Sequence, residues 1–177
     1  MNIAPSTKIF LQTQRRFWED EHYNIQGGFS KTNLPIGQIH YVKPDPKYVK
    51  STKQGIIMVY IWNNDALIFG SLRPDQVKQE AIEQIAKIHP EIKKENMVEK
   101  SVVHAWYNKP SYQGAFGFLK TSQFNNVRTL WEPMGNVHFA GETISFAAGW
   151  IQGALESGLK AAYQVYARGK KRTPGSN

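Results

Sequence analysis

The sequence contains no cysteine, which excludes disulfides, a thiolate nucleophile and cysteine-ligated zinc or iron–sulfur sites. It also lacks a long apolar run: the longest, residues 56–62, is far shorter than the roughly 20 residues that a helix needs to cross a bilayer. Because no apolar segment follows a basic start, we expect no signal peptide. We therefore expect a soluble globular protein without membrane association, and a cytoplasmic location is favoured over a secreted one.

Several catalytic signatures are missing as well. The chain has neither a Walker motif nor the Gly-x-Gly-x-x-Gly fingerprint of dinucleotide-binding domains. It has no Gly-x-Ser-x-Gly and no paired-carboxylate pattern, so hydrolase chemistry is not indicated. The five histidines are His22, His40, His89, His104 and His138. Their spacing is not that of metal ligands, so we predict structural roles for them and no metal site.

The net charge is +8, from 22 basic and 14 acidic side chains, but half of it lies in one short segment. That segment contains Arg168, Lys170, Lys171 and Arg172. It ends in Thr-Pro-Gly-Ser-Asn, a composition typical of a disordered tail. Without these four residues the charge is 8 − 4 = +4. We therefore expect no nucleic-acid partner, and a basic binding module is the least favoured hypothesis.

The 177 residues suffice for a domain of ordinary size with its own core. Alternating or β-branched residues predict strands over 8–14, 39–42 and 97–106. The apolar run 55–62 predicts a strand buried on both faces. Pro74 and apolar residues spaced by three and four predict a helix over 74–89. Residues 108–123 are expected to form a loop.

The last sixty residues have a different pattern. A short strand over 137–140 is predicted to run into Gly141 and Glu142, and a long helix begins at Gly149 or Trp150 and ends near Ala167. Its small residues at four-residue spacing need an explanation, because glycine costs about 1 kcal/mol in a helix interior. Close packing against a sheet and close approach of a ligand both explain them. A strand, a glycine turn and a helix N-terminus together are typical of a site for a phosphate-bearing cofactor.

Two segments at this end resemble the C-terminal end of flavin-dependent amine oxidases. They are Gly135-Asn-Val-His-Phe-Ala-Gly-Glu-Thr143 and Gly149-Trp-Ile-Gln-Gly-Ala-Leu-Glu-Ser-Gly-Leu-Lys-Ala-Ala162. Upstream matches follow in order at 7–11, 16–20, 27–28, 32–35, 55–60 and Trp106. They resemble the substrate domain of L-amino-acid oxidases, and together the matches span about residues 6–167.

The resemblance implies an α/β fold that is the C-terminal part of a two-domain, FAD-dependent amine oxidase. Residues 7–128 would form a mixed-sheet substrate domain, 129–167 the last strand and helix of a Rossmann-like FAD-binding domain, and 168–177 the basic tail. The family's ADP-binding segment and the arginine that binds the substrate carboxylate lie upstream of the first match. A missing N-terminal segment or second chain is thus an expected partner, and a fragment, a processed chain and a truncated gene product all stay open.

By resemblance, the substrate-domain site contains three residues. Lys8 matches the lysine that holds a water beside the flavin, although a lysine at a strand start is ordinarily solvated. Tyr60 matches the tyrosine that binds the substrate carboxylate, against the alternative of an ordinary buried tyrosine. Trp106 matches the tryptophan that packs near the flavin ring, with core packing as the alternative.

The resemblance places the remaining site residues around the final helix. Gly141 and Glu142 would bind FAD, with the carboxylate on the ribityl chain; the alternative for Glu142 is a helix N-terminal charge. Trp150 would form an aromatic wall beside the reacting carbon, and the Gly149 carbonyl would accept the substrate amine. The predicted cofactor contacts of the helix start are Gly149, Trp150, Ile151, Gln152, Gly153 and Ala154. The histidine that often precedes this Gly-Trp pair in the family is absent.

The implied reaction is FAD-dependent oxidative deamination of an L-amino acid or related primary amine. It would consume O₂ and yield a 2-oxo acid, ammonia and hydrogen peroxide, with the flavin supplying the electron chemistry. A non-catalytic or partner-dependent fragment of such an oxidase is the alternative.

Overall fold

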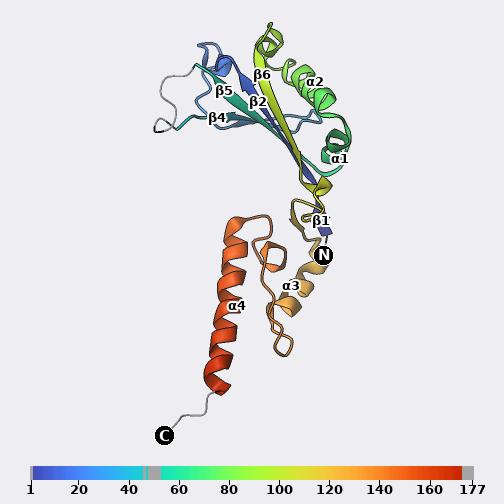
Figure 1. Ribbon diagram of the computed structural model, residues 1–177, viewed down its shortest axis with the longest axis vertical. Helices are drawn as coiled ribbons and strands as arrows, with labels where there is room; N and C mark the ends of the chain where they lie inside the picture. The colour runs from blue at the N-terminus through green and yellow to red at the C-terminus, as the bar shows by residue number, and fades with distance from the viewer. Residues whose placement is uncertain (1, 46, 48–52, 173–177) are drawn as a thin grey trace. The chain divides into compact units, whose positions relative to one another are not determined.

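The computed structural model describes residues 2–45, 47 and 53–172 and divides the chain into two compact units (Figure 1). One unit is Pro5–Gly114, and the other joins the first residues of the chain to everything after Gly114. The expected functional boundary between 128 and 129 is not tested by this division and stays a prediction.

The larger unit is built on a five-stranded sheet with the order β3-β4-β5-β2-β6. Its strands are β2 (Ser6–Thr13), β3 (Phe29–Lys31), β4 (Gln38–Val42), β5 (Gly55–Trp62) and β6 (Val98–Ala105). This confirms the four strands predicted in this region. Every pair is antiparallel, so the expected mixed sheet is wrong for this part of the chain. The parallel strands β5 and β6 are kept apart by β2, which lies between them.

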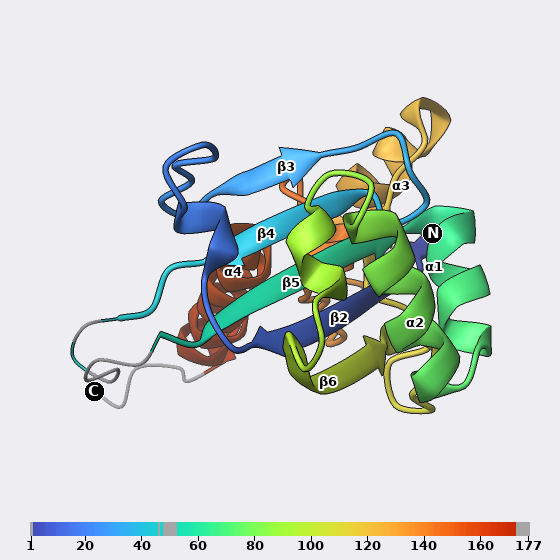
Figure 2. The same ribbon diagram turned by 90° about the horizontal axis from the view of Figure 1, so that it is seen from above.

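Two helices, α1 (Asn63–Ser71) and α2 (Pro74–Ile85), pack on one face of this sheet (Figure 2). The start of α2 at Pro74 confirms the prediction, and the chain continues through turns to the 3₁₀ helix η2 (Pro90–Lys93). The sequence did not predict α1. Two further 3₁₀ turns are η1 (Phe17–Glu19) and η3 (Trp106–Asn108).

The core lies between the helices and the sheet. On β2 and β5, Ile9, Leu11, Ile57 and Val59 are fully buried, and they alternate with less buried neighbours. The expectation that β5 is buried on both faces is wrong: Ile56 is 41% exposed. The helices of this unit cover only one face, so the alternate residues of β5 face the other side. That second face carries the candidate site residues of the sheet.

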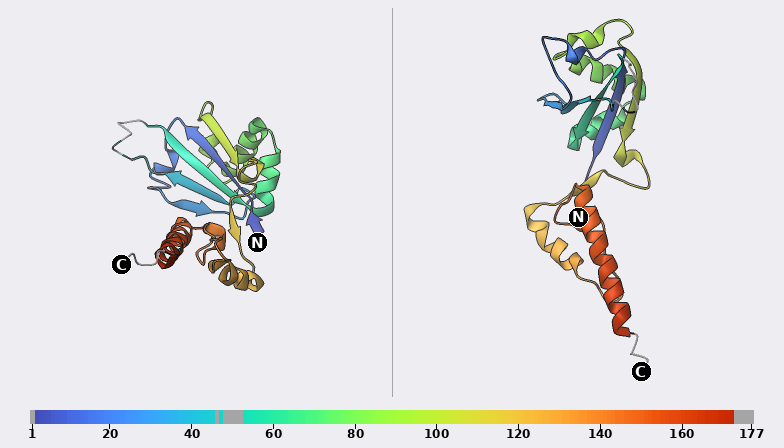
Figure 3. Two further views of the ribbon diagram at one scale, coloured as in Figure 1. Left: turned by 60° about the horizontal axis from the view of Figure 1, so that its bottom comes forward. Right: turned by 90° about the vertical axis from the view of Figure 1, so that its left-hand side faces the viewer.

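The smaller unit contains β1 (Asn2–Ala4) paired with β7 (Phe116–Phe118), then η4 (Thr121–Gln123), α3 (Phe124–Trp131), η5 (Glu142–Ile144) and α4 (Ile151–Arg172). The expected loop over 108–123 is therefore partly wrong, because it contains β7 and η4. Figure 3 shows α4 as one continuous helix. It runs past Gly169, so the predicted end near Ala167 is wrong, and residues 173–177 of the expected tail lie outside the described residues.

The strand expected over 137–140 does not form. In this part of the described chain, the only ladder contact is a single bridge between Met134 and Val137. A strand needs a neighbour to pair with its backbone groups, and among the described residues of this unit the only sheet is the β1–β7 pair. Gly141 therefore leads into η5 rather than from a strand into α4, so the predicted strand–glycine–helix anion site is not formed in that arrangement.

Candidate functional site

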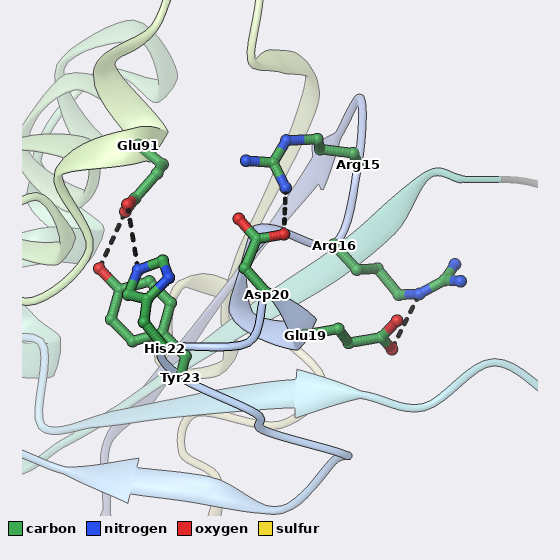
Figure 4. Close-up of polar contacts among 7 residues, drawn as sticks. All are labelled: Arg15, Arg16, Glu19, Asp20, His22, Tyr23 and Glu91. Atoms are coloured by element: carbon green, nitrogen blue, oxygen red, sulfur yellow. Dashed lines mark hydrogen bonds and ion pairs between the residues drawn. The ribbon is translucent and has the colours of Figure 1, made fainter.

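The charged segment 15–20 is a structural part of the larger unit (Figure 4). Arg15 donates to Asp20 at 2.6 Å, and Arg16 donates to Glu19 at 2.9 Å. Phe17, between these pairs, is fully buried. This motif of the resemblance thus fixes the turn after β2 and contributes no reactive group. Because both arginines are paired with carboxylates, they do not support a basic binding module.

Lys8 and Tyr60 are brought together on the sheet face away from α1 and α2. They are directly opposed in the β2–β5 pair, and the Lys8 ammonium lies 4.7 Å from the centre of the Tyr60 ring. The neighbouring Thr7 donates its hydroxyl to the Ala66 carbonyl of α1 at 2.9 Å, so the side chains on either side of it point away from the helices. The Lys8 side chain is half-buried and held by this cation–π contact, which is unlike a freely solvated lysine.

Imidazole and aromatic rings surround this pair. His104 of β6 is opposed to Lys8, and Trp62 lies edge-on to Tyr60 with ring centres 4.7 Å apart. The Gln38 amide oxygen accepts a hydrogen bond from His40 Nε2 of β4 at 2.9 Å. Burial and the nearby Lys8 ammonium lower the pKa of His40, which favours the neutral ring. The face therefore carries the Lys8 ammonium beside the rings of His40, Tyr60 and Trp62.

Trp106 begins η3, directly after β6. Its ring lies edge-on to His104 at 4.3 Å and to Tyr112 at 5.4 Å. It is half-buried and so is not an ordinary core tryptophan such as Trp18, which is fully buried. Trp106 is thus continuous with the ring cluster around Lys8. Its predicted flavin contact stays a prediction.

Glu142, in the smaller unit, ties two glycine backbones together. Its carboxylate accepts the Gly117 N–H of β7 at 3.0 and 3.1 Å, and it also accepts the Gly149 N–H. Hydrogen bonds to a charged carboxylate are stronger than neutral ones. Glu142 therefore positions the turn that leads into α4. Sequence reasoning missed Gly117, because nothing local marks a partner 25 residues away.

Gly141 and Gly149 have the geometry that close approach of a flavin would require. Their φ values are +142° and +83°, a region that favours glycine. No described atom lies within 4 Å of a Cβ added at Gly141, and at Gly149 the nearest is the Phe116 ring at 3.8 Å. The chain itself thus leaves room at both glycines, and these residues fit a bound FAD. Two backbone N–H groups already donate to the Glu142 carboxylate, so only its remaining lone pairs would be available to accept a hydrogen bond from FAD.

Gly153 has a different explanation. A Cβ there would lie 2.1 Å from Ser145 Oγ and 2.4 Å from the Ala147 carbonyl oxygen. Ser157, one turn later, is buried and accepts the Gly141 N–H at 2.9 Å. The small residues on this side of α4 therefore seat the 141–147 segment. Of the two explanations left open by the sequence, protein packing accounts for Gly153.

The remaining predicted residues lie at the exposed start of α4. Trp150 precedes the helix, donates its N–H to the Ala147 carbonyl at 3.2 Å, and has 68% of its surface exposed. Ile151 and Gln152 are also exposed, whereas Ala154 is half-buried. Lys8, Tyr60 and Trp106 thus form one group in the larger unit. Residues 141–154 form a second group in the smaller unit.

In the part of the chain that the structure describes, no three histidine, aspartate or glutamate side chains gather to hold a metal ion. No described helix is both long and apolar enough to cross a membrane.

Comparison with known proteins identifies the family. A model of the family described as "flavin containing amine oxidoreductase" matches residues 1–166. The chain belongs to the flavin-containing amine oxidoreductase family. Among family relatives, an L-amino-acid oxidase of Siganus canaliculatus is 32% identical over 162 residues, which are 90% of this chain and 30% of the relative. One of Daboia siamensis is 34% identical over 168 residues, covering 93% of this chain and 40% of the relative.

The fold of this family member is also similar to that of a solved structure. A putrescine oxidase redesigned for cofactor binding matches with a TM-score of 0.71 and 16% identity, over 92% of this chain and 35% of that chain. The resemblance stated from the motifs is thereby confirmed at the level of family and α/β fold. The chain spans about a third of the length of these proteins.

Proposed function

We propose that an oxidase containing this chain converts an L-amino acid, water and O₂ into a 2-oxo acid, ammonia and hydrogen peroxide. The observation that carries the proposal is the Lys8–Tyr60 pair. The family motifs select these residues from separate segments of the sequence, and the sheet places them in direct contact at 4.7 Å. The similarity to L-amino-acid oxidases favours an amino acid over other primary amines as the substrate.

Within this proposal, the larger unit binds the substrate and controls water and charge. The Tyr60 hydroxyl donates to the substrate carboxylate. Lys8 holds a water and stabilises negative charge as O₂ is reduced, because a fixed cation lowers the energy of a developing anion. Trp106 packs near the flavin ring. When bound, FAD would supply the electron chemistry that links oxidation of the substrate to reduction of O₂.

We propose that the smaller unit contacts FAD. The open sides of Gly141 and Gly149 let FAD approach the backbone, and the Gly149 carbonyl accepts a hydrogen bond from the substrate amine. Trp150 forms the aromatic wall. Glu142, which already anchors Gly149 and Gly117, holds this turn in place and contributes its remaining lone pairs to the ribityl chain.

The exposed apolar face of α4 supports the alternative in which this chain acts only with a further segment. Ile151, Leu155, Leu159 and Tyr163 recur every four residues and are 62–76% exposed. An exposed apolar patch of this kind indicates an interaction surface. About two thirds of the matched oxidases lie outside this chain. We propose that this missing part of the oxidase fold covers the face.

The visible absorption spectrum tests the proposal. The full chain would be purified with added FAD, alone and together with the N-terminal part of an L-amino-acid oxidase supplied as a second polypeptide. Oxidised flavin absorption that stays with the protein through gel filtration is expected in the mixture. The Leu159→Glu variant should lose the flavin and the second polypeptide together, whereas the matched exposed-site control Glu156→Gln should keep both. A mixture that never retains flavin would refute FAD binding by this chain.

A further inference from the structure

His89 is a titratable side chain buried in the larger unit. It is 1% exposed, and its Nε2 atom lies 2.6 Å from the Tyr41 hydroxyl. Its other ring nitrogen, Nδ1, is buried and has no hydrogen-bond partner among the described residues. Protonation would put a hydrogen on both nitrogens. The Nδ1–H would then lack an acceptor and a charge would lie in the core, which is costly.

The turn after η1, residues 20–25, closes over this ring and is called the flap below. Tyr23, in the flap, lies edge-on to His89 with ring centres 4.6 Å apart. Its hydroxyl donates to one oxygen of the Glu91 carboxylate at 3.0 Å. His22 lies 3.5 Å from the other oxygen of that carboxylate (Figure 4). Glu91, in η2, therefore holds the flap against the core.

The flap belongs to no helix or strand. The Ile25 N–H donates to the Trp18 carbonyl at 2.8 Å, and the Asn24 N–H donates to the Asp20 carbonyl within the flap at 2.7 Å. A loop outside the sheet ladder can open locally while the sheet stays folded. Opening of the flap would remove the Tyr23 ring from His89 and bring water to the unpaired nitrogen.

Charged and titratable groups face this cluster from every segment around it. They are Tyr41 of β4, His22 and Tyr23 of the flap, Glu91 of η2, Lys94 after η2, and the paired Arg15 and Asp20. Burial lowers the pKa of His89 and outweighs the nearby Glu91 carboxylate, which alone would raise it. Burial also raises the pKa of Tyr23 and of Tyr41, so both phenols stay uncharged in the acid range.

We propose that the flap is an acid-sensitive device, in which protonation of His89 opens it and frees Glu91 from Tyr23. In the closed state the neutral ring lies under Tyr23 and bonds to the Tyr41 hydroxyl. In the open state water accepts the hydrogen bond from Nδ1–H and hydrates the charge. His22 acts against opening, because its protonated ring attracts Glu91. This opposing effect is small because the His22 side chain is exposed.

The size of the effect follows from proton binding. A closed flap excludes the proton from His89, whereas an open flap lets the ring bind it with its ordinary pKa of 6.5. The equilibrium constant for opening should therefore rise about tenfold between about pH 7.5 and about pH 5.5.

Hydrogen exchange of the full chain, resolved by nuclear magnetic resonance, tests this. Each amide's rate would be divided by its intrinsic rate at the same pH, which gives a protection factor. Protection of the Asn24 and Ile25 amides should fall about tenfold between the two pH values and should not change with low urea. The Ile57 and Val59 amides of β5 should instead depend steeply on urea, because they exchange when the sheet unfolds. His89→Gln, which takes up no proton, should abolish the acid effect in the flap.

A second variant tests the contact with Glu91 separately. Tyr23→Phe keeps a ring over His89 but removes the hydroxyl, so flap protection should fall about tenfold at both pH values while the acid effect remains. The control Tyr112→Phe, at an exposed tyrosine of the same unit, should change flap protection less than about twofold. Flap amides as sensitive to urea as those of β5, protection that does not fall in acid, or an acid effect that persists in His89→Gln would each overturn the proposal. So would equal effects of the two tyrosine substitutions.

Discussion

Gly153→Ala and Gly158→Ala should change stability in opposite directions, although both replace glycine inside the same helix. In each case alanine improves the helix by about 1 kcal/mol, since glycine loses more backbone freedom on folding. At Gly158 no described atom lies within 4 Å of the added Cβ. Gly158→Ala should therefore raise the free energy of unfolding by nearly this full amount.

At Gly153 the same methyl group meets atoms that cannot easily move. It would lie 2.4 Å from the Ala147 carbonyl oxygen and 2.1 Å from Ser145 Oγ. Ser145 is fully buried and donates to the Glu142 carbonyl at 2.8 Å, so relief requires a backbone shift. Overpacking of this kind costs about 1–3 kcal/mol. With the upper value set against the gain in helix propensity, Gly153→Ala should be about 2 kcal/mol less stable than the wild type.

Urea unfolding of the full chain, followed by far-ultraviolet circular dichroism, measures both changes. The two variants should differ by about 3 kcal/mol, with the transition midpoint lowered in Gly153→Ala and raised in Gly158→Ala. Equal stabilisation of both would show that the 141–147 segment does not pack on α4. In that case the protein-packing explanation of Gly153 would be wrong.

The contacts of Glu142, His89 and Lys8 can each be tested by one substitution. Glu142→Gln should lower the free energy of unfolding by about 2 kcal/mol, because a hydrogen bond to a charged group is worth about 1.5–3 kcal/mol. The exposed control Glu156→Gln should change it by no more than about 0.5 kcal/mol. Equal effects of the two substitutions would argue against a structural role for the hydrogen bonds of Glu142 to Gly117 and Gly149. Burial lowers the pKa of His89 below its ordinary value of 6.5, so the unfolded chain binds more protons there than the folded chain. The free energy of unfolding should therefore fall as the pH drops below 6.5, and it should fall less steeply in His89→Gln. An unchanged dependence of stability on pH in that variant would contradict this. In a flavin-loaded assembly, Lys8→Met should slow reoxidation by O₂ roughly 10²–10³-fold while leaving reduction by substrate intact; stopped-flow traces with equal reoxidation rates would return Lys8 to a purely structural role.

Local patterns predicted the elements that depend on local chemistry. Pro74 and the apolar spacing after it predicted the start of α2, and the alternation over residues 8–14 predicted strand β2. The prediction of a strand over 137–140 was wrong because a strand needs a neighbouring strand to pair with, and the local sequence does not show whether one is present. The carboxylate contact between Glu142 and Gly117 joins positions far apart in the sequence. No periodicity encodes such a contact.

The candidate site was predictable only through family resemblance. Nothing in the spacing of Lys8 and Tyr60 indicates that they meet, because the β2–β5 register is set by the whole sheet. Gly153 was expected to contact the cofactor. The fold explains this glycine by packing instead, which was one of the two explanations that the sequence left open.

Release of hydrogen peroxide reports the proposed oxidase reaction itself. The flavin-loaded assembly of this chain with the segment that completes the oxidase fold would be screened with L-amino acids, D-amino acids and simple amines in a peroxidase-coupled assay. We expect peroxide with at least one L-amino acid, together with its 2-oxo acid and ammonia in equal amounts, and none with the D-enantiomer. An assembly that retains flavin but stays silent with every L-amino acid, or responds only to simple amines, would contradict it.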